Sequence, residues 1–275
     1  MNVMFEEWLN KKESAEDIIS ENLVSKFIAC LSSDFDSSNL LGLHWCLTQP
    51  AEPNINLNKD GHIKRGDFFP PIDLPQRMWA SSCINFYNKL TINKSINRSS
   101  EIKKIEKKIS KKTGELFFLD IEHKYFQNDL LMISEIQTLV YKNPSIKESH
   151  SKESIINLDQ EKIKITPNNI MLFRFSALSF NSHKIHYDKD YAIDEENYKN
   201  LVVQSPLIAS LVMNFIQSKN INKNLKKFEF RNTSPAYVNE GLNIYVGNNE
   251  VNVFNDQDRV LMSGKYKFYP LTILK

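Results

Sequence analysis

Apolar residues near the start of the chain recur at helical spacing. Leu23, Phe27 and Leu31 stand four residues apart, and Val24 and Ile28 lie beside them. Residues four apart fall on one side of an α-helix, so these positions form a single apolar face. The pattern therefore predicts an amphipathic helix in this segment.

Prolines and a turn signal separate this helix from a region with strand character. Residues 43–80 contain several prolines and the Asp60-Gly61 dipeptide, which predict a long ordered loop of the kind that is often functional. Residues 101–142 are rich in β-branched and aromatic residues with partial alternation, as in GELFFLDIEHKYF and DLLMISEIQTLVYK, and predict strands. The polar stretch 143–169 then predicts a linker or domain boundary.

The second half of the chain repeats the order of the first. A loop and helix region, residues 173–218, precedes four strand-like runs: KKFEFRN, LNIYVG, EVNVFND and RVLMSGKYKFY. No residue-level repeat accompanies this order. A helical region followed by antiparallel strands, twice over, predicts an α+β fold made of two similar halves.

Residues 201–217 predict a second helix, which should be buried because the run is almost wholly apolar. Ser205 followed by Pro206 is a helix-start pattern, with serine as the N-cap and proline at the first helical position. A buried helix start offers unpaired backbone N–H groups and partial positive charge, which suit a ligand oxygen that gains negative charge. A capped core helix without a ligand is the alternative.

Composition excludes several functional classes. The 275 residues are 41% hydrophobic and 25% charged, and 35 basic residues nearly balance 33 acidic ones. This balance gives no reason to expect nucleic acid or an anionic membrane as a partner, and no apolar run approaches the roughly 20 residues of a membrane span. The start of the chain lacks the basic-then-apolar pattern of a signal peptide, so we expect a cytoplasmic protein.

Cysteine and glycine usage narrows the chemistry further. Cys30, Cys46 and Cys83 are odd in number and form no CxxC pair, which favours three reduced thiols over a disulfide frame or a zinc ribbon. The chain has 7 glycines, and none lies between Gly114 and Gly241. The glycine-rich phosphate-binding loops of P-loop and dinucleotide folds are therefore absent.

Candidate chemistry is concentrated in FRFSALSFNSHKIHYDKDYA, residues 173–192. Asn181, His183, His186 and Asp188 lie close together there. The pKa of histidine is near neutrality, so the cluster favours acid–base catalysis. A metal site formed by His183, His186 and Asp188 is an alternative, although the spacing matches no standard zinc signature. A polar turn around a packed histidine is the third interpretation.

These residues carry a resemblance to a known family. SALSFNSHKIHYD, followed shortly by LVVQSPLIASL, resembles the MaoC-like hotdog hydratases and dehydratases of acyl thioesters, whose pattern is close to LSGDxNPLHxD and then HG at the start of a long apolar helix. The form FNxHRIHYD is typical of a subgroup that comprises mesaconyl-C4-CoA and itaconyl-CoA hydratases and type 2 3-hydroxyacyl-thioester dehydratases. GLHWCLTQP, KDGHIKRGDFFPPIDLPQRMWA and VYK resemble further elements of that subgroup, so the resemblance extends over residues 42–235.

The resemblance implies a double hotdog, an α+β fold in which two antiparallel sheets each wrap around a long helix. It implies an N-terminal hotdog-like domain over residues 1–145 that lacks the catalytic motif, and a linker over residues 146–168. A C-terminal MaoC-like hotdog domain over residues 169–275 then carries the motif. A monomer and a homodimer of the whole chain both agree with it, and it implies neither a cofactor nor a metal.

The resemblance also implies a reaction, the reversible hydration of an α,β-enoyl-CoA thioester. A short branched dicarboxylic acyl-CoA such as mesaconyl-C4-CoA or itaconyl-CoA is the expected substrate. One alternative is a 3-hydroxyacyl-thioester dehydratase of fatty acid synthesis, and another is a hotdog protein that binds acyl thioesters without turnover.

The resemblance implies roles for individual residues as well. His186 aligns with the catalytic histidine of the family and is expected to activate water. The backbone N–H of Ser205, which stands where the family has glycine, is expected to bind the thioester oxygen, with Pro206 and Leu207 beside the substrate.

Two departures from the family pattern change this expectation. Asn181, the second catalytic candidate, stands where the broader family has an aspartate, although the matching subgroup also has asparagine there. An amide can orient water or the thioester, but it does not accept a proton at neutral pH. Gln204 stands where the family has a histidine. We therefore expect His186 to act alone or to share protons with His183 or Asp188.

The remaining candidates have lesser expected roles. His183 is expected to orient water or contact substrate, and Asp188 to orient His186 as a carboxylate behind a catalytic histidine. Arg77 and Arg65 are candidates for binding a substrate carboxylate or the phosphates of CoA. A structural ion pair or a stabilised loop is the alternative for both arginines.

Overall fold

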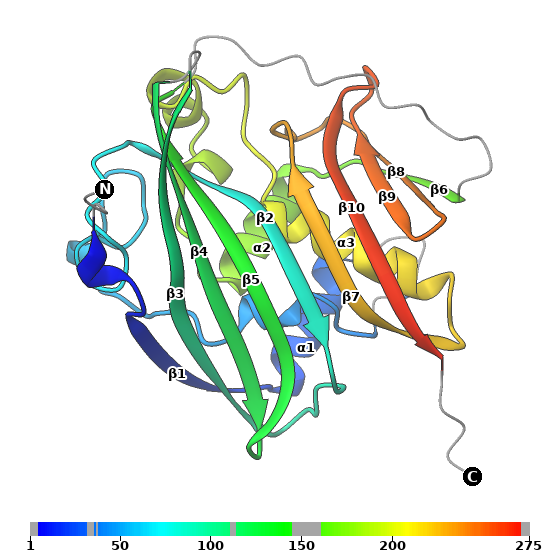
Figure 1. Ribbon diagram of the computed structural model, residues 1–275. Helices are drawn as coiled ribbons and strands as arrows, with labels where there is room; N and C mark the ends of the chain where they lie inside the picture. The colour runs from blue at the N-terminus through cyan, green and yellow to red at the C-terminus, as the bar shows by residue number, and fades with distance from the viewer. Residues whose placement is uncertain (1–4, 32–35, 37, 111–113, 145–160, 271–275) are drawn as a thin grey trace.

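A single twisted sheet forms the framework of the protein. The computed structural model describes residues 5–31, 36, 38–110, 114–144 and 161–270. The strands are β1 (Lys12–Ile18), β2 (Gln76–Phe86), β3 (Ser95–Ser110), β4 (Gly114–Gln127), β5 (Leu130–Lys142), β6 (Glu161–Ile165), β7 (Lys223–Asn232), β8 (Leu242–Gly247), β9 (Glu250–Phe254) and β10 (Val260–Pro270). The α-helices of the described chain are α1 (Glu21–Leu31), α2 (Asn169–Leu178) and α3 (Ser205–Ser218). All three lie on one side of the sheet (Figure 1).

Two sets of five strands make up the sheet, and both sets have the same order. The full order is β1-β3-β4-β5-β2-β7-β10-β9-β8-β6, so each set runs first, third, fourth, fifth, second from the edge inward. The two second strands, β2 and β7, pair at the centre, from Ser81 opposite Arg231 to Asn85 opposite Lys227. The antiparallel α+β prediction agrees with this, but the expectation of two separate sheets is wrong because the central pairing makes one continuous sheet.

The helices differ between the two halves. In each half a helix follows the first strand, α1 after β1 and α2 after β6. Only the second half then has a longer helix, α3, before its second strand. In the first half the described part of this interval holds the short 3-10 turns Leu43–Cys46 and Asn54–Asn56. Within the described residues, the long helix expected in each half is therefore found only in the second half.

The helix α3 is the centre of the hydrophobic core. Every residue from Leu207 to Gln217 is buried, and the core around α3 includes residues from both halves. Asn214 Nδ2 donates hydrogen bonds to the carbonyl oxygens of Leu41 and Ser210. A Cβ at Gly42 would lie 2.0 Å from Ser210 Oγ, so the backbone approaches α3 here as only glycine allows. The long loop of the first half is therefore anchored on α3.

Most predicted elements are found where the sequence places them. The first predicted helix is α1, the two quoted strand runs of the first half are β4 and β5, and the four runs of the second half are β7 to β10. The strand β1 and the helix α2 were not predicted, and residues 76–80, predicted as loop, begin β2.

The predicted linker is shorter than expected. Residues 161–165 form β6 and α2 begins at Asn169, while residues 145–160 lie outside the described residues. The domain limits given above stay a prediction.

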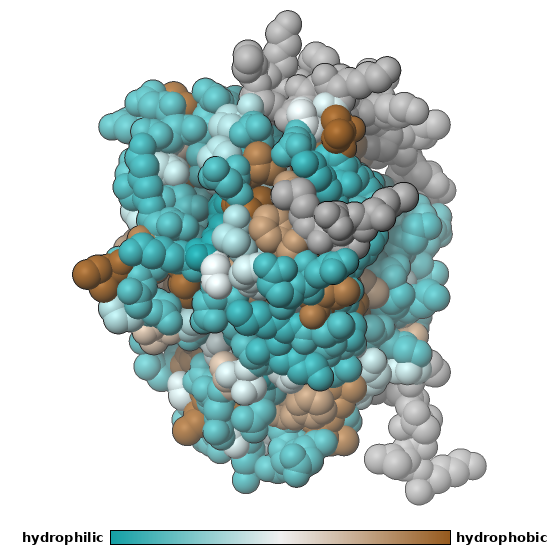
Figure 2. Space-filling view, turned by 60° about the vertical axis from the view of Figure 1, so that its left-hand side comes forward, coloured by the Kyte–Doolittle hydropathy of each residue, from teal (hydrophilic) through white to brown (hydrophobic). Residues whose placement is uncertain are grey.

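The described chain contains no helix with the length and apolar character needed to cross a membrane. Hydrophilic residues predominate on the face in Figure 2, where apolar residues lie in separate spots.

Candidate active site

His186 has a fixed ring at the end of the 3-10 turn Lys184–His186 (η4), where it is buried. Its Nδ1 lies 2.7 Å from the carbonyl oxygen of Val202 and must donate to it, since a carbonyl only accepts. Burial, with a smaller contribution from His183, lowers the pKa of His186 to about 3, so the ring is neutral at physiological pH. Nε2 is then an unprotonated acceptor, and it has no hydrogen-bond partner among the described residues.

The start of α3 lies close to this ring. The N–H of Val202 donates to the carbonyl oxygen of Ile185 over 2.9 Å, so the chain before α3 runs alongside the His186 turn. Ser205 comes three residues after Val202, a stretch that spans at most about 11 Å. Hydrogen bonds therefore tie the predicted base and the predicted helix start together.

The backbone N–H groups at this helix start are available to a ligand. The N-cap is Gln204 and not Ser205 as predicted, since Gln204 has an extended backbone and Ser205 is the first helical residue. The side chain of Gln204 donates to the carbonyl oxygen of Leu172 and gives the helix no capping bond. Among the described residues nothing accepts from the N–H of Ser205 or Leu207, and Pro206 has none. Ser205 and Pro206 are only partly buried, so a ligand oxygen can approach this end of α3.

Asn181 and His183 build the turn that carries His186. The Oδ1 of Asn181 accepts from the backbone N–H of His183 over 3.0 Å, so this amide stabilises the turn after α2. The ring of His183 is buried and nearly perpendicular to that of His186, with centroids 5.5 Å apart. Burial lowers the pKa of His183 to about 3. The two predicted histidines thus adjoin each other, and both are neutral near pH 7.

A loop of the first half docks onto this turn. The N–H of Lys184 donates to the carbonyl oxygen of Asp60 over 2.9 Å, and the Oγ of Ser182 donates to that of Gly61. Gly61 has a φ of 89°, and a Cβ there would lie 1.8 Å from the carbonyl oxygen of Ser182. Glycine is therefore required both for the backbone conformation and for the close approach.

The docked loop adds a third histidine. The ring of His62 packs on that of His183 with centroids 4.0 Å apart. The two carboxylate oxygens of Asp60 face the backbone N–H of His62 at 2.9 Å and its Nδ1 at 3.1 Å. Burial, and then the charge of Arg77, hold the pKa of His62 well below its ordinary value. A row of three neutral imidazoles, His62, His183 and His186, therefore crosses the site.

Glu196 contacts this row from the other side. Its Oε1 lies 3.1 Å from Nε2 of His183, and its backbone oxygen accepts from Nε2 of Gln76. The side chain is buried, and Oε2 is enclosed without a hydrogen-bond partner in the described part of the chain. Burial, and then the charge of Asp60, raise the pKa of Glu196 to about 7.

Asp188 does not contact His186. Its Oδ1 accepts from the N–H of Tyr191 over 3.1 Å, and its Oδ2 lies 3.9 Å from Nζ of Lys184. The carboxylate therefore starts the next turn, and the carbonyl of Val202 orients His186 in its place.

The two candidate arginines have different environments. Arg65 donates to the carbonyl oxygens of Ile72 and Leu74 and packs over the ring of Tyr141, so it stabilises the loop and is not free to bind substrate. Arg77 lies over the ring of Phe69, and no hydrogen bond or ion pair of its guanidinium is found within the described residues.

One group of potential metal ligands gathers in the described chain. Asp60, His62 and His183 each bring one ligand atom within 4.8 Å of the others. The bond of Asp60 to His62 and the contact of His183 with Glu196 already give these side chains partners, so we assign them no ion. The alternative set of His183, His186 and Asp188 is not assembled, since Asp188 points elsewhere.

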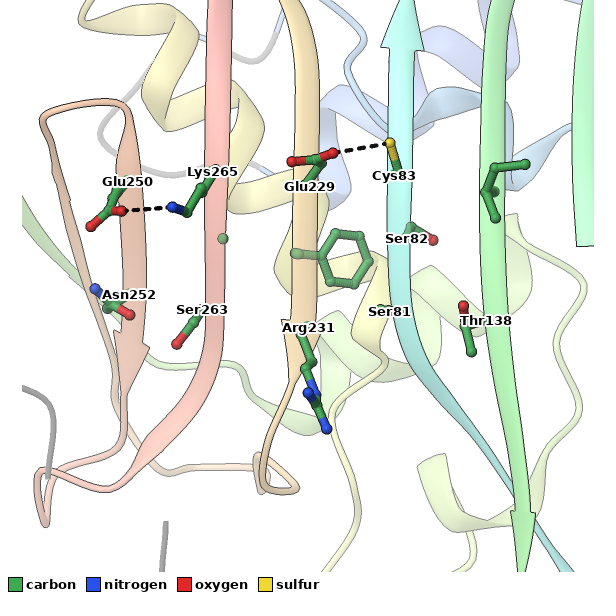
Figure 3. A pocket seen from close by; sticks show the side chains of 13 residues that line it. Ser81, Ser82, Cys83, Thr138, Glu229, Arg231, Glu250, Asn252, Ser263 and Lys265 are labelled. Carbon is green, nitrogen blue, oxygen red and sulfur yellow. Dashed lines mark hydrogen bonds and ion pairs between the residues drawn. The ribbon is translucent and has the colours of Figure 1, made fainter. Parts of the chain in front are cut away.

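A separate hollow lies on the face of the sheet turned away from the helices (Figure 3). It has a volume of about 530 Å³, and polar residues such as Ser81, Thr138, Glu229 and Arg231 line it. None of the predicted site residues belongs to it, so the hollow is not part of the candidate site.

Comparison with known proteins gives these residues a family context. The family model "Hydroxyacyl-thioester dehydratase type 2" matches residues 42–238. The chain is 36% identical over 196 residues to mesaconyl-C(4)-CoA hydratase of Chloroflexus aurantiacus, covering 70% of this chain and 69% of that protein. The chain belongs to the hydroxyacyl-thioester dehydratase type 2 family. A mitochondrial member from Schizosaccharomyces pombe is 31% identical over 247 residues, or 80% of this chain and 81% of that protein.

Solved structures give the fold of this hydroxyacyl-thioester dehydratase type 2 family member. A MaoC-like dehydratase from Phytophthora capsici superposes with a TM-score of 0.66 over 95% of this chain and 96% of the other, at 11% identity. A protein of Mycobacterium tuberculosis described as a double hotdog superposes with a TM-score of 0.60 over 94% and 96%, at 8% identity. The chain therefore has the MaoC-like hotdog fold.

Three residues of this family member's site were not predicted as site residues. The sequence carries a signal for Asp60 and His62, because both lie at the Asp60-Gly61 turn within the KDGHIKR run that resembles the family. Glu196 had none, since it is one of several acidic residues in a polar stretch. Its burial depends on long-range packing.

Proposed function

We propose that this protein catalyses the reversible addition of water to the double bond of an α,β-enoyl-CoA thioester, with His186 as the base. The observation that carries the proposal is the fixed tautomer of His186, whose Nδ1 is bound to the carbonyl of Val202 while Nε2 remains an acceptor beside the start of α3. The likeness to a mesaconyl-C(4)-CoA hydratase supports it.

Hydration of the enoyl thioester needs a base for the attacking water, hydrogen-bond donors for the thioester oxygen, and a proton for Cα. A water molecule gives a proton to Nε2 of His186 as its oxygen bonds to Cβ of the thioester. The electron pair of the double bond moves toward Cα, and negative charge develops on the thioester oxygen. The free N–H groups at the start of α3, at Ser205 and Leu207, are placed to bind that oxygen, and the helix dipole adds to the effect. Protonation at Cα completes the addition.

Arg77 supports a substrate with a second carboxylate. It is partly buried, has no acidic partner among the described residues, and lies near enough to His62 and His183 to lower the pKa of both. A guanidinium in such a place suits a carboxylate, which it can hold with two hydrogen bonds. A short branched dicarboxylic acyl-CoA, such as mesaconyl-C4-CoA or itaconyl-CoA, is therefore the proposed substrate.

A second candidate is dehydration of a 3-hydroxyacyl thioester of fatty acid synthesis. The family description and the relative from Schizosaccharomyces pombe favour it. The site chemistry is the same reaction run in reverse, so the difference lies in the acyl group. This relative and a similar one from Saccharomyces cerevisiae are described as mitochondrial, and the cytoplasmic location and the homodimer stay predictions.

A spectrophotometric screen tests the proposal. Purified protein is given mesaconyl-C4-CoA, itaconyl-CoA, crotonyl-CoA and longer enoyl-CoA thioesters, and loss of the enoyl-thioester absorbance is followed. We expect His186→Gln to lower kcat/KM by about 10²- to 10⁴-fold. Arg77→Gln should raise KM for the dicarboxylic substrates and leave crotonyl-CoA unchanged, while Arg231→Gln, on the far face of the sheet, should change neither. Equal hydration by wild type and His186→Gln would contradict the assigned base.

A further inference from the structure

The proposed hydration has an unassigned proton donor. His186 takes a proton from the water that attacks Cβ. Cα must then receive a proton, either from another group or from His186 as it returns the same proton. Asn181 has no acidic proton to give at neutral pH, and its Oδ1 is already bound to the backbone of His183. The site therefore calls for a group that holds a proton near pH 7 and touches the histidine row.

Glu196 has the geometry of such a group. It follows the π-helical turn Tyr191–Glu195 (η5), and only 5% of its surface is exposed. One oxygen faces Nε2 of His183 at 3.1 Å, and the other is enclosed without a partner in the described chain. A buried carboxylate with an unpaired oxygen is costly, whereas a neutral carboxyl can donate its O–H to His183 and needs no donor at the other oxygen. The contacts favour the protonated form.

The charged and titratable groups around Glu196 come from several elements. Burial raises its pKa most, the carboxylate of Asp60 in the docked loop raises it further, and Lys142 at the end of β5 lowers it, so that the pKa is about 7. The remaining titratable groups that face it are His183, Tyr191 and Tyr198, and the pKa of each tyrosine is raised, first by burial and then by Glu196.

We propose that Glu196, acting through His183, supplies the proton that Asn181 cannot supply. This inference rests on the proposed function. In the hydration direction the water O–H bond breaks, its proton goes to Nε2 of His186, and hydroxide bonds to Cβ. Nδ1–H of His183 gives its proton to Cα while Nε2 takes the proton of the Glu196 carboxyl. The result is an ionised Glu196 and a protonated His186, and solvent returns the proton between turnovers.

His183 is suited to carry this proton. Its Nε2 faces Glu196, and its Nδ1 has no hydrogen-bond partner in the described part of the chain. When Glu196 donates to Nε2, the neutral ring must carry its own hydrogen on Nδ1. Glu196 is thus a positioning residue, which sets the tautomer and proton content of His183, and it need not touch substrate.

The pH profile of catalysis follows from this assignment. In the active form Glu196 is protonated and His183 is neutral, so kcat/KM should fall as pH rises through about 7 and Glu196 ionises. The reaction consumes no net proton, so kcat/KM must fall in the same way for hydration and dehydration. A purely structural Glu196 would produce no such ionisation.

The test compares wild type, Glu196→Gln, Asn181→Asp and the double variant of both. We expect Glu196→Gln to lose about 10- to 100-fold in kcat/KM below pH 7 and to lose the ionisation near pH 7. Asn181→Asp in the Glu196→Gln background should restore activity at least about tenfold, because it returns a carboxyl to the turn that carries the histidines. Glu195→Gln, which alters the exposed neighbour, should match wild type throughout.

A second measurement does not depend on turnover. Carbon-13 NMR of side-chain carboxyls should show one group that titrates near pH 7 in wild type and is missing in Glu196→Gln. If no such group exists, the inference is overturned, whatever the activity. It is also overturned if wild type is active and Glu196→Gln keeps the same rate, or keeps the ionisation at a uniformly lower rate. Failure of wild type to convert any enoyl-CoA, with the titration present, contradicts the proposed function instead.

Discussion

Two buried histidine–glutamate pairs, one in each half of the molecule, have opposite chemistry. In the first half, Glu135 on β5 has both oxygens occupied. Its Oε2 accepts from Nε1 of Trp45 at 2.9 Å and lies 3.4 Å from Nε2 of His44, and its Oε1 accepts from Ser82. In the second half Glu196 meets His183 with one oxygen only, and its other oxygen has no partner among the described residues.

The number of donors around each carboxyl explains the difference. Burial would raise the pKa of Glu135, but His44, His123 and Ser82 together hold it below the ordinary value. Glu196 lacks such donors, and its pKa rises to about 7. Hydrogen bonds to a carboxylate stabilise the charged form, and burial without them favours the neutral form. The same residue pair is therefore a fixed structural anion in one half and a proton carrier in the other.

Removing the first pair should have the largest effect on stability. Glu135→Gln replaces an acceptor of several hydrogen bonds by an amide whose NH₂ faces other donors. We expect the free energy of unfolding to fall by about 3–5 kcal/mol, since breaking a buried charged network leaves its partners unpaired. Urea denaturation followed by circular dichroism measures this. Glu106→Gln on β3, which removes an exposed ion pair with Lys104, should leave the free energy of unfolding almost unchanged because solvent screens exposed pairs. An equal loss in both variants would contradict the contrast.

The second pair should respond to substitution in a pH-dependent way. The pKa of Glu196 rises from 4.5 to about 7 on folding, so between these values the folded state binds more protons than the unfolded one. Wild-type stability due to this group is then full below pH 4.5 and lost as pH rises through 7, a change of about 3 kcal/mol. Glu196→Gln cannot ionise and should gain about that much relative to wild type between pH 4.5 and 8.

Urea denaturation at pH 4.5 and at pH 8 shows whether Glu196→Gln gains or loses stability relative to wild type as pH rises. Glu135→Gln is the matched control. The lowered pKa of Glu135 gives stability that is present above its ordinary value of 4.5 and is lost only as pH falls below it, so the cost of Glu135→Gln should be nearly the same at pH 4.5 and pH 8. If Glu196→Gln instead lost stability at both pH values, Glu196 would be an ordinary buried anion like Glu135.

Local patterns were enough to find one part of this site. The turn that carries His186 and the buried helix start both have local signals, and the resemblance to a family singles out His186 as the base, a role that stays a prediction. The helix start was expected with Ser205 as its N-cap, and the structure places the cap one residue earlier, at Gln204, whose side chain bonds to α2 and gives the helix no capping bond. Periodicity likewise found α1 and the hairpin strands.

Long-range packing determined the rest. The central pairing of β2 with β7, which joins the sheet, has no local signal, and neither has the docking of Asp60 onto Lys184. Asp188 was expected beside His186 because it is near in sequence. Its carboxylate instead accepts a hydrogen bond from the backbone N–H of Tyr191 in the next turn. Proximity along the chain is a poor guide where a short turn reverses the direction of side chains.

The loop of the first half connects the two pairs, and Gly61→Ala should disturb this connection. A Cβ at Gly61 would meet the carbonyl of Ser182 at 1.8 Å, so the loop must withdraw and carry Asp60 and His62 away. We expect kcat/KM to fall by about tenfold, or about 1.4 kcal/mol. Gly66→Ala is the control, because Gly66 also has a positive φ, 109°, but has no atom within 4 Å of an added Cβ. Equal losses of kcat/KM in the two variants would mean that backbone strain alone, and not the contact with Ser182, causes the effect.

Replacing Lys142 on β5 should have the smallest effect, a modest change in the pKa of Glu196. β5 carries both Glu135 and Lys142, and the charge of Lys142 lowers the pKa of Glu196. Lys142→Met keeps the apolar stem and removes the charge, so the titration midpoint of Glu196 should rise by less than about one pH unit. Carbon-13 NMR of the carboxyls measures this midpoint, and the alkaline limb of kcat/KM should move with it. Lys124→Met on β4, which removes an ion pair with Glu122, should leave both unchanged. A fall of the midpoint in Lys142→Met would mean that burial and Asp60 do not govern Glu196 as assigned.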